Sequence, residues 1–190
     1  MDFSPSPRAA EYTERMRAFL DEVVLPAEPV LDEQLAATAG EWGTRPIVRE
    51  LQAEARRRRL WNLFLPGHPD GLSNLDYAPV AELSGWSPRL APVAMNCAAP
   101  DTGNMELLHG FGTPEQQERW LEPLLEARIR SAFCMTEPDV ASSDATNIAT
   151  RIERDGDELV ITGRKWWSTG AMNPDARLLI VMGVTDPDAE

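Results

Sequence analysis

Apolar positions in the first two thirds of the chain recur at helical spacing. The clearest stripe, with members three and four residues apart, comprises Tyr12, Met16, Phe19 and Val23. A helix is therefore expected to begin after Pro7 and to bury this stripe. Pro26 and Pro29 are expected to end it, because proline lacks the N–H that a helix interior needs.

A second helix is expected from Pro46, since proline suits the first turn of a helix. Its buried side is formed by Ile47, Leu51 and Ala55, and it ends in the run Arg56–Arg59. This run admits two interpretations: a basic binding patch or targeting signal, or cations placed favourably at a helix C-terminus. We favour the second, because the chain has no other run of basic residues of this length.

Further helices are expected before residue 129. One spans Leu75–Trp86 with Asn74 as its cap, and the next spans Asp101–Phe111. The clearest start is Thr113–Gln116, where a Thr stands three residues before a Gln and proline takes the first helical position, as in a capping box. Pro123 is expected to end or kink that last helix.

The pattern becomes that of strands after residue 129. Ser131–Met135 is a short apolar run, and Leu178–Met182 has the continuous apolar pattern of a strand buried on both faces. Asp155 and Gly156 give a hairpin signal just before the apolar stretch Leu159–Ile161. These signals predict four or five short strands.

The expected fold class is therefore α+β. An all-α helical domain of residues 1–128 precedes an antiparallel β domain of residues 129–190. Because the sequence stops after few strands, this sheet is expected to be incomplete, with unpaired edges.

Composition narrows the function. Acidic side chains number 31 against 18 basic ones in 190 residues, and the net charge of −13 argues against nucleic acid and anionic membranes as partners. No apolar run approaches the roughly 18 to 20 residues of a membrane span, and the N-terminus lacks a signal-peptide layout, so the cytoplasm is expected. Cys97 and Cys134, with two histidines, are too few for a disulfide framework or a metal site.

A serine hydrolase is a distant alternative. Ser142, Ser143 and Asp144 lie close together and folding could bring His109 to them, but no Gly-x-Ser-x-Gly elbow is present. Gly110–Gly112 opens like a dinucleotide fingerprint, yet the third glycine is missing and a helix precedes it. We therefore reject a Rossmann site.

Two segments carry candidate chemistry. Residues 133–144 run from an apolar strand into a loop rich in hydroxyl groups, which offers N–H and O–H donors to a polar ligand or phosphate. Residues 163–171 hold Trp166 and Trp167 on an expected strand, where one indole can face the core while the other offers a flat surface to a cofactor. The alternatives are a loop satisfied by its own side chains and a tryptophan that fills the seam between the domains.

These two segments, in this order, resemble the signatures of the acyl-CoA dehydrogenase family. The second matches the family's Gly-x-Lys-x-Trp-x-Thr strand through Gly163, Lys165, Trp167 and Thr169. Upstream, Gly112–Leu124 resembles the segment that leads into the family's β domain. Asn96–Met105 and Trp166–Ser168 are similar to the branch that contains acyl-CoA dehydrogenase members 10 and 11.

The resemblance implies a fold and a reaction. Members have an N-terminal helical domain, a middle β domain and a C-terminal helical domain, with FAD held between the last two. They dehydrogenate a fatty acyl-CoA thioester: a glutamate takes the α-proton and the flavin takes the β-hydride, and electrons pass in most relatives to an electron-transfer flavoprotein. That glutamate lies in the C-terminal domain, which is expected to be missing here, so no catalytic base is assigned.

The resemblance also implies individual roles at the flavin. Main-chain groups of Phe133, Cys134 and Met135 and the hydroxyl of Thr136 are expected to line the edge of the flavin ring. Thr169 is expected to hydrogen-bond near the reactive edge of the ring, and Ser168 to contribute backbone contacts. Trp167 is expected to pack on the ring. Ser143 would touch the acyl-CoA or the FAD diphosphate. The loop Pro138–Asp144 is one residue longer than in many relatives and has no glycine, so Ser142 could take the role of Ser143.

Two functions stay open. The first is FAD-dependent α,β-dehydrogenation of a fatty acyl-CoA, with this chain as the N-terminal part of the enzyme and a C-terminal half or a homo-oligomer partner completing it. The second is a non-catalytic module, inactive on its own, that binds acyl-CoA or a partner subunit.

Overall fold

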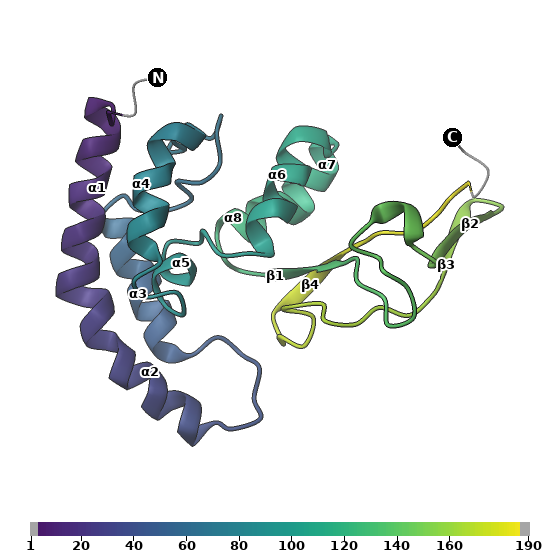
Figure 1. Cartoon of the computed structure of the whole chain (residues 1–190), viewed down its shortest axis with the longest axis horizontal. Coiled ribbons are helices and arrows are strands. Elements are labelled where there is room, and N and C mark those ends of the chain that lie inside the picture. The colour runs from purple at the N-terminus through teal and green to yellow at the C-terminus, as the bar shows by residue number, and fades with distance from the viewer. Residues whose placement is uncertain (1–3, 187–190) are drawn as a thin grey trace. The chain divides into compact units, whose positions relative to one another are not determined.

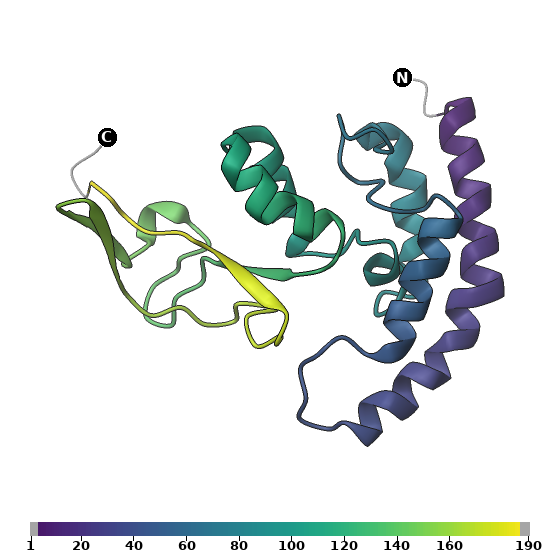
Figure 2. The same ribbon diagram turned by 180° about the vertical axis from the view of Figure 1, so that it is seen from behind.

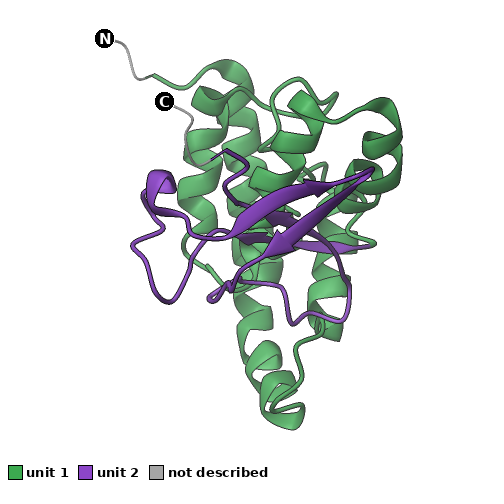
Figure 3. Ribbon diagram, turned by 90° about the vertical axis from the view of Figure 1, so that its right-hand side faces the viewer, with its two compact units in different colours: residues 1–128 green, residues 129–190 purple. Residues whose placement is uncertain are grey.

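The computed structural model describes residues 4–186, and the expectations drawn from Met1–Phe3 and Pro187–Glu190 lie outside them. The chain forms two compact units that divide between Arg128 and Ile129 (Figure 3). The part before this division, unit 1, is helical, and the part after it, unit 2, contains the strands. The α+β class is confirmed.

Unit 1 begins with one long helical stretch in three parts (Figure 1). These are α1 at Pro7–Phe19, a π turn at Leu20–Val24 and α2 at Leu25–Ala37. The prediction that Pro26 and Pro29 end the helix is wrong, because both lie within α2. The wider π turn comes first, so Pro26 occupies the second position of a new α segment, where a missing N–H costs little. Pro29 is tolerated inside α2 at the cost of one hydrogen bond.

A second proline follows a π turn in the same way. The parts here are α7 at Pro114–Gln116, a π turn at Gln117–Leu121 and α8 at Glu122–Leu125. Pro123 again takes the second position of the α segment, so the distortion expected there has the form of a π turn. The capping box is confirmed: the Thr113 hydroxyl accepts the N–H of Gln116, whose side chain accepts the N–H of Thr113.

The other helices of unit 1 are α3 at Pro46–Arg57, α4 at Asn74–Ser84, α5 at Ala91–Ala94 and α6 at Asp101–Phe111. The expected start at Pro46 is confirmed. Asn74 is the first residue of α4 and not its cap; Ser73 is the cap, because its hydroxyl accepts the N–H of Asp76. The core is apolar, and its large fully buried side chains include Met16, Phe19, Leu60, Val80 and Met95.

Unit 2 holds two pairs of strands (Figure 1, Figure 2). They are β1 at Arg130–Cys134, β2 at Arg151–Asp155, β3 at Glu158–Thr162 and β4 at Ala176–Val181, with a 3-10 turn at Ala145–Asn147. The antiparallel expectation holds for the β2–β3 hairpin, but β1 pairs with β4 in parallel. The long connection between β1 and β4 returns the chain to the end where β1 began, as a parallel pair requires.

Two details of the strands bear on the predictions. The expected hairpin forms, but its two turn residues are Gly156 and Asp157, because Asp155 pairs with Glu158 as the last residue of β2. Gly156 has φ +62°, a value suited to the first position of a type II′ turn. The prediction that the last strand is buried on both faces is wrong, because Leu179 is 53% exposed. Its side chain lies on the opposite face of β4 from its half-buried neighbours Leu178 and Ile180.

Within residues 4–186, no helix combines the length and the apolar character that crossing a membrane requires.

Candidate functional site

Lys165 joins the two segments that the sequence singled out. Its ammonium donates to Glu137 Oε1 over 2.7 Å and to the carbonyl of Met135 over 2.9 Å. Next to it, the N–H of Trp166 donates to the carbonyl of Thr136 over 3.1 Å. Residues 133–144 and 163–171 are therefore neighbours in unit 2, although the hairpin separates them in sequence.

Glu137 is ionised and held on several sides. Its side chain is almost fully buried, and besides Lys165 it accepts the N–H groups of Ala149 at 2.8 Å and Thr150 at 2.9 Å. Burial alone would raise the pKa of this carboxyl, but the hydrogen bonds from Lys165 and from the two amides outweigh it and lower the pKa to about 2. The carboxylate is therefore a fixed negative charge and not a proton acceptor at neutral pH.

Sequence reasoning missed this pair, although it named the segments. A signal was present: Lys165 is the only lysine among the 18 basic residues of the chain. A compact ammonium donates in several directions from one point, whereas a planar guanidinium donates from a fork, so a lone lysine in a chain that otherwise uses arginine was a position to examine.

The loop Pro138–Asp144 is organised from within. Ser142 is buried, and its hydroxyl accepts the N–H of Glu137 over 2.7 Å. Asp144 accepts the N–H and the hydroxyl of Thr146 and so caps the 3-10 turn at Ala145–Asn147. The alternative of a self-satisfied loop thus describes Ser142 and Asp144 well. Ser143, unlike Ser142, is exposed, so its hydroxyl is open to a ligand.

Trp166 and Trp167 are both solvent-exposed, at 46% and 79%, with ring centroids 5.6 Å apart. The expectation that they alternate between core and surface is wrong, because residues 163–168 are not a strand. Trp167 has φ +53°, a left-handed conformation that costs energy for a bulky side chain and is often found at ligand sites. The exposed indole of Trp167 offers a flat apolar surface.

The groups around these tryptophans define what a ligand can meet. Among residues 4–186, no hydrogen bond involves the hydroxyls of Thr136, Ser143, Ser168 or Thr169. The carbonyls of Cys134, Met135 and Thr136 are already taken, by Met182, Lys165 and Trp166 respectively. Phe133 is 37% exposed, whereas the side chain of Cys134 is buried.

Gly163 allows a close approach in this region. A Cβ at this position would lie 2.2 Å from the hydroxyl oxygen of Thr150 and 2.9 Å from its Cα. Thr150 is the residue whose N–H binds Glu137, so the glycine lets the segment with Lys165 pack directly beside the carboxylate. The motif glycine thus has a steric reason.

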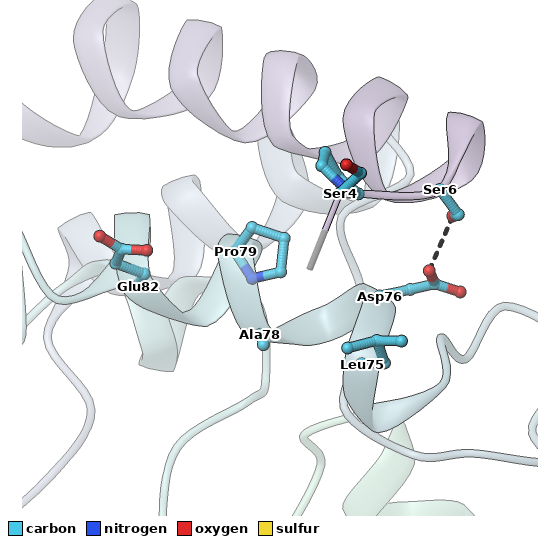
Figure 4. Close-up of a pocket in the computed structure, with 8 residues that line it drawn as sticks. Ser4, Ser6, Leu75, Asp76, Ala78, Pro79 and Glu82 are labelled. Atoms are coloured by element: carbon cyan, nitrogen blue, oxygen red, sulfur yellow. Dashed lines mark hydrogen bonds between the residues drawn. The ribbon is translucent and has the colours of Figure 1, made fainter. Parts of the chain in front are cut away.

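Cavities in unit 1 have a different character. One of about 290 Å³ lies at the start of α1 beside α4, where the Ser6 hydroxyl donates to Asp76 (Figure 4). Its lining includes two carboxylates and no cation, which disfavours an anionic ligand. Another of about 540 Å³ is lined by Arg56, Arg59, Trp61 and Asp70. Neither contains a predicted site residue.

The run Arg56–Arg59 is largely structural. Arg57 and Arg58 donate to Glu54 over 2.8 Å and 2.6 Å, and these bonds lower the pKa of Glu54 to about 2. Arg56 lies 3.6 Å from the ring centre of Trp61 and donates to the carbonyl of Glu126. These contacts support the interpretation as cations at a helix C-terminus. In the described part of the chain, no cluster of His, Cys, Asp and Glu could hold a metal ion.

Residues 132–190 match the family model for the middle domain of acyl-CoA dehydrogenases. A Mycobacterium tuberculosis protein named as acyl-CoA dehydrogenase FadE2 is 55% identical over 190 residues, which is 100% of this chain and 46% of that protein. Acyl-CoA dehydrogenase family member 11 of Gallus gallus is 50% identical over 186 residues, covering 96% of this chain and 24% of its own length. The chain thus spans less than half the length of these curated relatives.

Solved structures agree. A structure assigned to an acyl-CoA dehydrogenase of Mycobacterium abscessus has a TM-score of 0.90 and 55% identity, covering 98% of this chain and 48% of its own. A glutaryl-CoA dehydrogenase of Mycobacterium smegmatis, solved in complex with FADH2, has a TM-score of 0.71 at 20% identity, over 95% of this chain and 43% of its own, which shows a shared fold. The chain belongs to the acyl-CoA dehydrogenase family, and residues 132–190 fall in the middle domain of that family.

Proposed function

We propose that this protein is an FAD-dependent acyl-CoA dehydrogenase that removes hydrogen from the α and β carbons of a fatty acyl-CoA thioester. One observation carries the proposal: Lys165 and Trp166 hydrogen-bond to Glu137, Met135 and Thr136, which holds the segment with the exposed Trp167 against the end of β1 and the loop that follows it. Family membership supports it. Residues 129–190 would be the flavin-contacting domain and residues 1–128 the helical domain.

The residues present fit a flavin. The indole of Trp167 is exposed and held in a constrained backbone conformation, as a stacking surface for a flat ring should be. The hydroxyls of Thr136 and Thr169 and main-chain groups of Phe133, Cys134 and Met135 would line the ring edge, and Ser168 would add a backbone contact. When bound, FAD supplies the acceptor for the β-hydride.

The chain's own groups would act by orientation and by charge. Donors aimed at the rim of a ring that gains electrons stabilise the added negative charge, because they need no reorganisation during the reaction. Stacking on Trp167 would keep the ring in one plane, so that the acyl chain meets it at a fixed distance. Ser143 is exposed and is the group we assign to the acyl-CoA or the FAD diphosphate. Ser142 is buried against Glu137 and would shape the loop.

A visible absorption spectrum tests the function. The purified protein, including any residues that precede or follow those printed, is measured before and after adding an acyl-CoA. A flavin band that bleaches with the thioester supports dehydrogenation. Thioester binding without a flavin band would instead indicate the non-catalytic module. Reoxidation of the bleached protein by an electron-transfer flavoprotein would identify the electron acceptor that we expect.

A further inference from the structure

Lys165 stands out in composition and in geometry. It is the only lysine of the chain, and its side chain is 12% exposed beside a Glu137 side chain that is 5% exposed. From one nitrogen it reaches Glu137 Oε1 at 2.7 Å and the Met135 carbonyl at 2.9 Å. An ammonium can donate in several directions from a single point, whereas a guanidinium donates from a planar fork. The geometry therefore suits lysine specifically.

The Lys165–Glu137 pair fixes the path of the main chain in both segments, residues 133–144 and residues 163–171. Trp167 follows directly after the residue that bonds to Thr136, and its φ is +53°. A bulky residue keeps such a conformation only when its surroundings hold it there. Glu137 fixes the other segment, residues 133–144, because its carboxylate also accepts the N–H groups of Ala149 and Thr150.

We propose that Lys165 and Glu137 are positioning residues of the flavin site, an inference that rests on the function proposed above. Both side chains are buried and neither touches the ligand. They hold the main chain at Met135 and Thr136 against the segment with Trp167. The indole and the Thr136 hydroxyl then meet the flavin ring in one fixed arrangement.

The chain offers a matched control. Arg164 and Asp139 form an ion pair at 3.1 Å that joins the same two segments, but their side chains are 72% and 79% exposed. A surface pair of this kind contributes little, because water screens both charges. Arg164→Met tests whether any link between the segments matters or only the buried one.

The experiment separates positioning from stability. Lys165→Met leaves the Glu137 carboxylate buried without its partner, so a fall in both the melting temperature and the affinity for FAD is expected. The double variant Glu137→Gln/Lys165→Met removes both charges and should recover the melting temperature of the parent to within a few degrees. Its FAD dissociation constant should stay at least about tenfold above that of the parent, and the visible circular dichroism of its bound flavin should differ. Arg164→Met should match the parent in every measurement.

Lys165→Arg provides a second route if the double variant does not fold. It keeps the charge opposite Glu137 but not the ammonium geometry, so a folded protein with weakened FAD binding is expected. FAD affinity and flavin dichroism like those of the parent, in either folded variant, would overturn the positioning role and leave the proposed function intact. A parent protein that binds no FAD would overturn the proposed function and this inference together.

Discussion

Asn96 donates its side-chain amide to Asn62 Oδ1 over 2.7 Å in the interior of unit 1, and both residues have left-handed backbones, with φ of 55° and 54°. Asn96 also donates to the carbonyl of Leu124, and Asn62 to that of Leu125. The two amides thus add hydrogen bonds to carbonyls at the end of α8, where the helix supplies no further N–H four residues on. Asparagine suits this role because it tolerates the left-handed region and brings its own donor.

Replacing Asn96 should therefore be costly. Asn96→Ala leaves the buried Oδ1 of Asn62 without this donor and puts a residue that tolerates the left-handed region less well than asparagine at a φ of 55°, so we expect a loss of about 3 kcal/mol in the free energy of unfolding. Asn96→Gly loses the same hydrogen bonds without that strain, so its loss should be smaller by about 1 kcal/mol. Chemical denaturation measures both, and equal losses would argue against backbone strain at this position.

Two glycines of unit 2 should respond differently to alanine. At Gly163 a Cβ would meet Thr150 at 2.2 Å, so the segments must move apart and a cost of about 3 kcal/mol is expected. At Gly156 nothing lies within 4 Å and only the φ of +62° opposes a side chain, which predicts about 1 kcal/mol. Thermal or chemical unfolding compares the two variants. A Gly156→Ala variant that is the less stable of the two would contradict the steric account.

Acid should destabilise unit 2 through Glu137. Its carboxyl has a pKa of about 2 in the folded protein against an ordinary value of 4.5, because the hydrogen bonds from Lys165 and two amides outweigh the effect of burial. The stabilisation is fully present above pH 4.5 and is lost as the pH falls towards 2. Unfolding measured across this range should depend less steeply on pH in Glu137→Gln. An unchanged slope would show that other carboxyls dominate.

Trp167 should matter for binding and not for folding. Its side chain is 79% exposed, so Trp167→Ala should change the free energy of unfolding by less than about 0.5 kcal/mol. The same change removes the stacking surface and should weaken FAD binding by more than about tenfold. Leu159→Ala is the matched control, because Leu159 is 68% exposed in the same unit and lies on the hairpin. A similar loss of FAD binding in both variants would contradict a specific role for Trp167.

Local chemistry in the sequence determined most of the helices and the hairpin. The capping box at Thr113, the start at Pro46 and the turn at Gly156 depend on a few adjacent residues, so the sequence alone predicts them. The prediction that Pro26 and Pro29 end the first helix was wrong, because the sequence does not reveal the π turn that places Pro26 at a tolerated position.

Only the tertiary structure decided how the candidate site is built. Both motifs were visible in the sequence, but the bond between Lys165 and Glu137 depends on the path of the intervening hairpin, which brings together residues far apart in the chain. The parallel pairing of β1 with β4 and the exposure of Trp167 are non-local in the same way. Short-range patterns determine elements because the relevant energies act between neighbours. Contacts across long loops depend on packing and burial, which exist only once the chain has folded.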